Sequence, residues 1–161
     1  MPRTIFSTAL GRCALAWDEQ GNLTRFELPE AVGQANDLAV PPKEIATLVT
    51  RVRRHLDGEP QDFSSERYAL ASVPEFARQV YLAALAVKAG HTATYGELAA
   101  AMGQPAAVSR AVGAVLGINP WPLLIPCHRI VAASGKMTGF SAPGGVATKA
   151  RLLALEGATL L

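Results

Sequence analysis

Hydrophobic and polar positions alternate weakly over the first 30 residues, and this alternation predicts short β-strands. Gly21 falls in the polar stretch DEQGN, residues 18–22, which has the composition of a turn. The strand candidates are TIFST, CALAW and LTRFEL. We therefore expect an antiparallel hairpin or meander at the start of the chain.

After the strands, the spacing of hydrophobic residues changes from alternation to a helical period, which predicts a helix. In PPKEIATLVTRVRRHLDGEP the hydrophobic residues recur at helical spacing, and Gly58 with Pro60 ends the pattern. The residues of this stripe are Ile45, Leu48, Val49, Val52 and Leu56. Residues 59–73 are polar and irregular, so a boundary between two lobes is best placed there.

The chain becomes mainly helical from Pro74. The segment PEFARQVYLAALAVKAG has its proline in the expected first turn and Gly90 at its end. The residues expected to face a core are Phe76, Val80, Leu82, Ala83 and Val87.

The segment TATYGELAAAMGQPAAVSRAVGAVLG predicts two short helices, from about Tyr95 to Met102 and from about Ala106 to Leu116. The turn GQP joins them, which makes a helix-turn-helix candidate. Residues 117–126 hold three prolines and should form a rigid loop, and GVATKARLLALEG should form the last helix.

These elements predict an α+β fold. A small N-terminal antiparallel sheet with a helix, residues 1–70, would form a scaffold lobe. A mainly helical and winged-helix-like C-terminal domain, residues 71–161, would contain the helix-turn-helix.

Length, charge and cysteine content limit the classes of protein to which this chain could belong. A length of 161 residues suits one domain, or two small lobes that share a core, and a net charge of +2 is too small for a protein that coats polyanions. No segment approaches the roughly 20 apolar residues of a membrane span, and the start resembles no signal peptide. Cys13 and Cys127 lie far apart, and with three histidines they show no metal-ligand spacing. We expect free thiols in a cytoplasmic protein without a metal.

The second helix of the candidate pair carries mostly small side chains. Gly113 lies in its interior, where glycine costs roughly 1 kcal/mol relative to alanine. Tight packing against a neighbouring helix is one explanation, and close approach to a narrow nucleic-acid groove is the other. Arg110 is the one long cation of this helix, and it is either a surface charge or a functional side chain.

The stretch LLIPCHRIV places Cys127 between a proline and His128. A thiolate is the attacking form of cysteine, and a nearby base raises its fraction. Because adjacent side chains usually diverge, His128 would act through a water molecule, and a third group would orient the imidazole. Glu156 is the candidate, since an acidic residue near a helix C-terminus is unfavourable unless it has a specific partner. A buried structural cysteine and a solvated glutamate remain the alternatives.

The motif IPCHRIV, preceded by TATYGELA and RAVGAVLGINPWP and followed by LLALEG, resembles the O6-alkylguanine-DNA alkyltransferases. These are also called methylated-DNA–protein-cysteine methyltransferases. The resemblance covers about half of the chain, from Phe76 to Gly157, whereas the N-terminal lobe matches only in its order of strands and helix.

The resemblance implies that the helix-turn-helix binds duplex DNA in the minor groove and that the damaged base is flipped out of the stack. Arg110 matches the finger that fills the gap, and it lies among the expected DNA-binding residues Ser109, Ala111 and Gly113. The stretch between Tyr95 and Arg110 is one residue longer than in the human-type protein, which bears on the depth that Arg110 reaches.

The resemblance also implies the chemistry. Cys127 matches the alkyl acceptor, His128 the proton acceptor, and Glu156 the group that holds the imidazole. Tyr95 matches the tyrosine that hydrogen-bonds guanine N3, and Asn119 the hinge that braces the loop.

The base pocket implied by the resemblance is lined by Pro122, the Ile130 carbonyl and the Ser141 amide. Phe140 stands where many members have tyrosine, so a hydroxyl is missing from the pocket wall. The sequence SAPGG replaces a plainer Gly-Gly loop, which could change the tolerance for bulky alkyl groups.

The implied reaction is an irreversible, single-turnover transfer to Cys127 of a methyl or alkyl group from O6 of guanine, and also from O4 of thymine. The implied partner is double-stranded DNA that holds O6-alkylguanine. We expect no cofactor and no membrane partner, and a monomer that could assemble cooperatively on DNA. A non-catalytic sensor of alkylguanine is the alternative, and a cysteine hydrolase would need an oxyanion hole that the sequence does not reveal.

Overall fold

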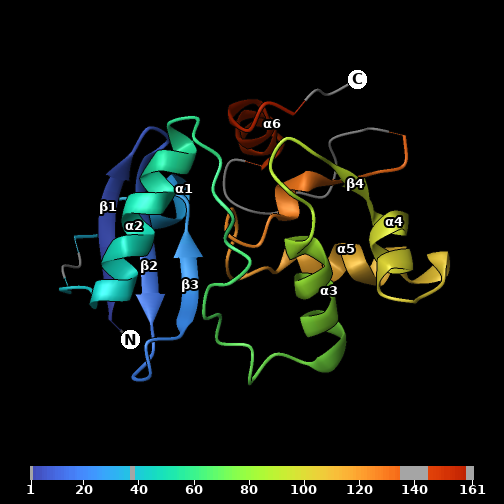
Figure 1. Ribbon diagram of the computed structural model, residues 1–161, viewed down its shortest axis with the longest axis horizontal. Helices are drawn as coiled ribbons and strands as arrows, with labels where there is room; N and C mark the ends of the chain where they lie inside the picture. The colour runs from blue at the N-terminus through green and yellow to red at the C-terminus, as the bar shows by residue number, and fades with distance from the viewer. Residues whose placement is uncertain (1, 37–38, 135–144, 159–161) are drawn as a thin grey trace.

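The computed structural model describes residues 2–36, 39–134 and 145–158. A three-stranded antiparallel sheet in the order β1-β2-β3 lies at one side of the molecule, and the helices of the second half lie at the other (Figure 1). The strands are β1 (Arg3–Thr8), β2 (Gly11–Trp17) and β3 (Leu23–Glu27). The expected meander and the α+β class are both confirmed.

Helix α2 (Lys43–Leu56) packs against β1, and the short helix α1 (Pro29–Val32) precedes it. All five residues of the predicted hydrophobic stripe of α2 are buried. His55 is buried in the same stripe, although it was not among the residues expected there. A polar residue at a core-facing position requires a hydrogen-bond partner.

Helix α3 (Glu75–Leu85) is confirmed, with one error in its buried face. Leu82 was expected to face the core, but 52% of its surface is exposed. Successive helical residues are rotated by about 100°, so Leu82 lies about 200° around the helix from Val80, which is fully buried. The face that packs consists of Ala77, Val80, Tyr81, Ala84 and Leu85.

The helix pair is present as α4 (Tyr95–Ala101) and α5 (Ser109–Gly117), and the 3-10 turn η1 (Ala106–Val108) leads into α5. Thr94 starts α4 with a capping box: its Oγ1 accepts the Glu97 N–H at 3.0 Å, and Glu97 Oε1 accepts the Thr94 N–H at 2.8 Å. Strand β4 (Ala93–Thr94) pairs in parallel with β5 (Ile130–Val131). This pairing sets the start of α4 beside the segment that follows Cys127.

The loop between α5 and the 3-10 turn η2 (Cys127–Arg129) joins the two halves of the molecule. The Leu23 carbonyl accepts a hydrogen bond from Trp121 Nε1 at 2.9 Å, and the Phe26 N–H donates to the Pro120 carbonyl at 2.9 Å. One hydrophobic cluster contains residues of the sheet, α2, α3, α5 and this loop. The two lobes therefore share a core, while the boundary between residues 70 and 71 stays a prediction.

The last helix, α6 (Gly145–Leu155), begins where the prediction placed it. Within the described residues, no helix is long and apolar enough to cross a membrane.

Candidate active site

Pro126 sets the backbone that presents Cys127. With φ −82° and ψ 65°, Pro126 adopts an inverse γ-turn, and the Cys127 N–H donates to the Ile125 carbonyl at 2.8 Å. Cys127 then starts the η2 turn, so its sulfur lies close to the backbone N–H groups of Cys127 and His128. The donors at the start of a helical turn favour negative charge, which is useful for a thiolate.

Asn119 braces the loop that leads to Cys127. Its Nδ2 donates to the Ile125 carbonyl at 2.8 Å, and its Oδ1 accepts the Trp121 N–H at 2.9 Å. Between these two contacts Leu123 has a φ of +78°, a conformation that costs energy in residues other than glycine. The side chain of Asn119 thus holds a strained, fully buried segment in one conformation.

Replacing Asn119 with alanine removes both contacts. The Ile125 carbonyl keeps its bond from the Cys127 N–H, but the buried Trp121 N–H loses its acceptor. We expect the free energy of unfolding to fall by about 2–3 kcal/mol, as for two lost hydrogen bonds with a buried group left unsatisfied. Urea denaturation followed by circular dichroism measures it. Gln104→Ala, which removes an exposed amide, is the matched control and should change stability by less than about 0.5 kcal/mol. An equal effect of both substitutions would contradict the bracing role.

Cys127 is buried, with 7% of its surface exposed, and its thiol holds its proton at rest. Burial raises the pKa of Cys127 above its usual value, although hydrogen bonding with Asn119, the charge of Lys149 and the two backbone N–H groups act in the opposite direction. Lys149 of α6 is buried, and its Nζ donates to the Ile130 carbonyl at 2.7 Å. Lys149 was not predicted as a site residue, although a lysine between Thr148 and Leu152 on the core face of a helix was a signal. A thiol of this kind needs a base before it can attack.

His128 has the properties of that base. Its ring is fully buried, and Nε2 is 2.9 Å from Glu156 Oε2. Burial lowers the pKa of His128, although the hydrogen bond with Glu156 raises it, so the imidazole is neutral near pH 7. Because Glu156 accepts the Nε2 hydrogen, Nδ1 carries the lone pair, and it makes no hydrogen bond to another described residue.

Glu156 receives four hydrogen bonds. Arg129 donates from Nε to Oε1 at 2.9 Å and from a terminal nitrogen to Oε2 at 2.8 Å. His128 and His55 both reach Oε2, at 2.9 Å and 2.7 Å. Burial alone would raise the pKa of Glu156, but the bonds from Arg129, His128 and His55 hold it well below its usual value. The predicted Glu156 is therefore a buried, ionised partner of His128, while Arg129 and His55 were missed.

Several small residues of α5 and of the preceding turn η1 lie on the surface. Ala107, Arg110, Ala111 and Ala114 are all exposed, at positions that share one helical face. Small side chains that pack against a neighbouring helix would be buried, so this exposed face favours approach to an external partner. Arg110 has no hydrogen bond or ion pair with any other described residue.

Gly113 lies on a different side of α5. A Cβ atom at this position would lie 3.6 Å from the Tyr95 ring, so Gly113 faces the start of α4. The small size of Gly113 thus serves internal packing. Ser109 is half-buried, and its hydroxyl donates to the Ala106 carbonyl at 2.7 Å. Tyr95 is half-buried. Burial raises the pKa of Tyr95, and the charge of Cys127 acts in the same direction, so the two side chains lie near each other.

Two of the four predicted pocket residues lie in the part of the chain that the structure describes. Pro122 and Ile130 are buried, and the Ile130 carbonyl accepts a hydrogen bond from Lys149 Nζ. Phe140 and Ser141 lie outside the described residues.

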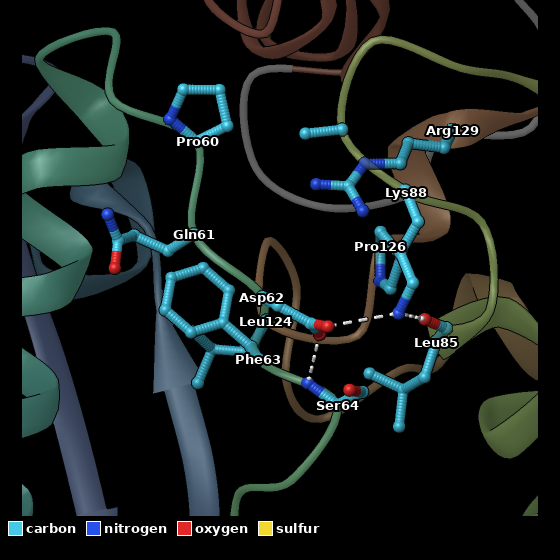
Figure 2. Close-up of a pocket in the computed structure, with 11 residues that line it drawn as sticks. Pro60, Gln61, Asp62, Phe63, Ser64, Leu85, Lys88, Leu124, Pro126 and Arg129 are labelled. Atoms are coloured by element: carbon cyan, nitrogen blue, oxygen red, sulfur yellow. Dashed lines mark hydrogen bonds and ion pairs between the residues drawn. The ribbon is translucent and has the colours of Figure 1, made fainter.

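A cavity of about 220 Å³ lies between the segment 60–64, the end of α3 and the loop before Cys127. Figure 2 shows Lys88 reaching toward Asp62, and the Lys88 Nζ to Asp62 Oδ2 distance is 3.2 Å. Pro126 and Arg129 belong to its lining, but Cys127 does not. The described residues contain no group of three or more His, Cys, Asp or Glu side chains placed to hold a metal ion.

Comparisons with known proteins agree on one family. The family model described as 6-O-methylguanine DNA methyltransferase, DNA binding domain, matches residues 75–158. A methylated-DNA–protein-cysteine methyltransferase of Methanothermobacter thermautotrophicus is 35% identical over 91% of this chain and 80% of its own length. One from Methanosarcina acetivorans is 34% identical over 95% of this chain and 96% of its own.

Solved structures resemble the whole fold. The crystal structure of Mycobacterium tuberculosis OGT in complex with DNA has a TM-score of 0.81 and 30% identity over 98% of this chain and 93% of its own. The O6-methylguanine-DNA methyltransferase of the archaeon Pyrococcus kodakaraensis has a TM-score of 0.70 and 25% identity over 96% of this chain and 99% of its own. The likeness therefore includes the N-terminal lobe, which the sequence motifs did not cover.

Proposed function

This chain belongs to the 6-O-methylguanine DNA methyltransferase family, and from that membership we propose that Cys127 accepts the alkyl group of O6-alkylguanine in duplex DNA. It is an enzyme of the methylated-DNA–protein-cysteine methyltransferase class, which acts in DNA alkyl repair. The observation that carries the assignment to Cys127 is the arrangement of Cys127, His128 and Glu156. A buried thiol follows a braced loop, and its neighbour is a neutral imidazole held by an ionised carboxylate.

In the proposed reaction, His128 Nδ1 takes the thiol proton through a water molecule. The sulfur then forms a bond to the alkyl carbon as the bond from that carbon to guanine O6 breaks, and the electron pair of the broken bond stays with the base. Tyr95 donates a hydrogen bond to guanine N3, which stabilises the negative charge that develops on the departing base. The base becomes neutral guanine when it takes up a proton, which balances the proton that left the thiol. Glu156 stabilises the imidazolium that forms on His128.

The product is a thioether, and the proposed mechanism contains no group that removes the alkyl chain from sulfur. Each molecule therefore acts once. Transfer from O4 of thymine follows the same chemistry, because the reacting unit is again an alkyl group on an exocyclic oxygen. We propose that a monomer carries out the reaction and that assembly on DNA is a separate property.

The exposed small-residue face of α5 supports a DNA-binding role for Arg110, Ala111 and their neighbours. A minor groove is only about 6 Å wide, so a helix can approach it closely when its facing side chains are small. Arg110 is the one long side chain on this face, and we propose that it occupies the space left by the flipped base. The contact between Gly113 and Tyr95 gives Gly113 an indirect part in holding the two helices together.

A single labelling experiment tests the proposed function. The protein is incubated with duplex DNA that holds radiolabelled O6-methylguanine, and the label on protein is counted and then located by peptide mapping. We expect at most one label per chain, on the peptide that contains Cys127. Binding without transfer would instead support a sensor of alkylguanine. Release of a small labelled product with turnover would support a hydrolase.

Replacing Arg110 with alanine should slow methyl transfer by about 10- to 100-fold, because a loss of about 1–3 kcal/mol in holding the flipped base slows the step by that factor. The affinity for undamaged duplex should fall less than about 3-fold, since one surface cation contributes little to general DNA binding at physiological salt. Single-turnover rates and equilibrium binding measure the two effects. Arg54→Ala removes an exposed arginine of α2 and is the matched control. Equal losses of transfer and general affinity would count against a role in flipping.

A further inference from the structure

His55 is a buried polar residue of the N-terminal lobe that the proposed reaction does not yet use. It lies in the last turn of α2, with 1% of its surface exposed. Its Nε2 is 2.7 Å from Glu156 Oε2, although the two residues are 101 positions apart. His55 and His128 therefore contact the same carboxylate oxygen.

The contacts of His55 determine which ring nitrogen carries the hydrogen. The backbone N–H of Gln61 donates to Nδ1 at 3.0 Å, so Nδ1 is the acceptor and Nε2 holds the hydrogen that it donates to Glu156. The Phe63 ring packs beside the imidazole with a centroid distance of 5.3 Å. Gln61 and Phe63 belong to the segment that lines the cavity of Figure 2. The imidazole is thus a neutral donor, and the segment after α2 holds its orientation.

A neutral donor suits this carboxylate, because Arg129 already balances its charge. Oε2 accepts hydrogen bonds from Arg129, His128 and His55, and Oε1 accepts from Arg129 Nε. An ionised carboxylate has about four lone-pair sites, and four donors meet this one, three of them at Oε2. A cation at position 55 would oppose protonation of His128, whereas a neutral ring fixes the carboxylate without that penalty.

We infer that His55 is a positioning residue for alkyl transfer: its Nε2–H holds Glu156 so that the carboxylate orients His128. The N-terminal lobe thereby contributes directly to the reactive site of the other lobe and is more than a scaffold. The inference rests on the proposed function, because it gives His55 a part in the proton transfer from Cys127.

Two substitutions separate positioning from packing. His55→Gln keeps an N–H donor near the place of Nε2, whereas His55→Phe keeps a ring and removes the donor. The measurements are the single-turnover rate of methyl transfer at saturating duplex and the dissociation constant for the same duplex. We expect His55→Phe to slow transfer by about 10- to 100-fold and His55→Gln to stay within about 3-fold of the parent protein, with the dissociation constant unchanged in both.

The pH profile provides a readout that loss of packing would not move. With one donor fewer, Glu156 is a stronger acceptor for His128 and raises the pKa of His128, so the acid limb of the rate should move to higher pH in His55→Phe. The titratable or charged groups around this pair are His128 and Arg129 from η2, His55 from α2 and, beside Cys127, Lys149 from α6. Only His55 changes in the experiment.

A His55→Phe protein with the parent rate and pH profile would overturn the inference, and so would a folded His55→Gln protein as slow as His55→Phe. If the phenylalanine variant does not fold, nitrogen-15 NMR of the unmodified protein decides. We expect the hydrogen of His55 on Nε2 and a lone pair on Nδ1, and hydrogen on Nδ1 would refute the donor role. Failure of the proposed function is distinct, because the unmodified protein would then transfer no label.

Discussion

Replacing Glu156 with glutamine is expected to lower the free energy of unfolding by about 3–5 kcal/mol, because it leaves a buried cation without its partner. The same change should slow methyl transfer at least about 100-fold, since His128 loses the group that orients it as a base. Glutamine has nearly the size of glutamate, so packing changes little. Its amide nitrogen, however, would face at least one of the four donors that now meet the carboxylate. Urea denaturation and single-turnover transfer measure the two losses.

Glu75→Gln provides the matched control for the loss of charge. Glu75 pairs with Arg78 at 3.3 Å on the surface of α3, where its side chain is 70% exposed. Removal of an exposed pair costs at most about 1 kcal/mol, and transfer should not change. A loss of stability below about 1 kcal/mol in Glu156→Gln would contradict a buried network of charges around this residue.

The stability that Glu156 contributes should depend on pH in one direction. Hydrogen bonds hold the pKa of Glu156 below its usual value of 4.5, despite the opposing effect of burial. The unfolded chain therefore takes up a proton at a higher pH than the folded chain does. The contribution is present in full above the unfolded pKa and is lost as the pH falls toward the folded one. The parent protein and Glu156→Gln should thus approach each other in stability only in acid.

Periodicity predicted the elements well because each depends on neighbours in the sequence. The stripe of α2 and the capping signal TATYGE of α4 are local patterns, and both helices begin within a few residues of the expected positions. Leu82 was assigned to the wrong face because a run of hydrophobic residues in α3 fits more than one face. Which face of α3 is buried depends on the elements that pack against it, and the sequence of one helix does not identify those elements.

The proposed reactive site could be predicted from the sequence only as far as its motif extends. Cys127, His128 and Glu156 could be selected from residue type and resemblance, but Arg129 and His55 could not be placed on the carboxylate. The contact between His55 and Glu156 spans 101 positions and depends on the packing of α2 against the second lobe. No spacing rule encodes such a contact. The available signal was a polar residue on a buried helical face, which needs a partner somewhere in the fold.

Replacing His128 with phenylalanine should slow methyl transfer by about 10²–10⁴-fold near neutral pH, because it removes the proposed proton acceptor and retains most of the volume. The variant can react only through thiolate that forms without a base. Burial raises the pKa of Cys127 above its usual value of 9.0, so that thiolate is scarce at pH 7. Single-turnover transfer from about pH 5.5 to 9 measures the effect. His91→Ala removes an exposed histidine and is the control.

The two proteins should differ in the shape of the pH profile as well as in rate. Burial lowers the pKa of His128 despite its bond to Glu156, so the parent protein should keep its rate as the pH falls to about 6.5 and lose it only below that value. In His128→Phe the rate should instead rise about tenfold with each pH unit up to the pKa of Cys127, since only the thiolate attacks. A variant with a flat profile and near-normal rate would mean that another group accepts the thiol proton. Lys149 would then be the residue to test, because its charge reaches Cys127 and burial lowers its own pKa.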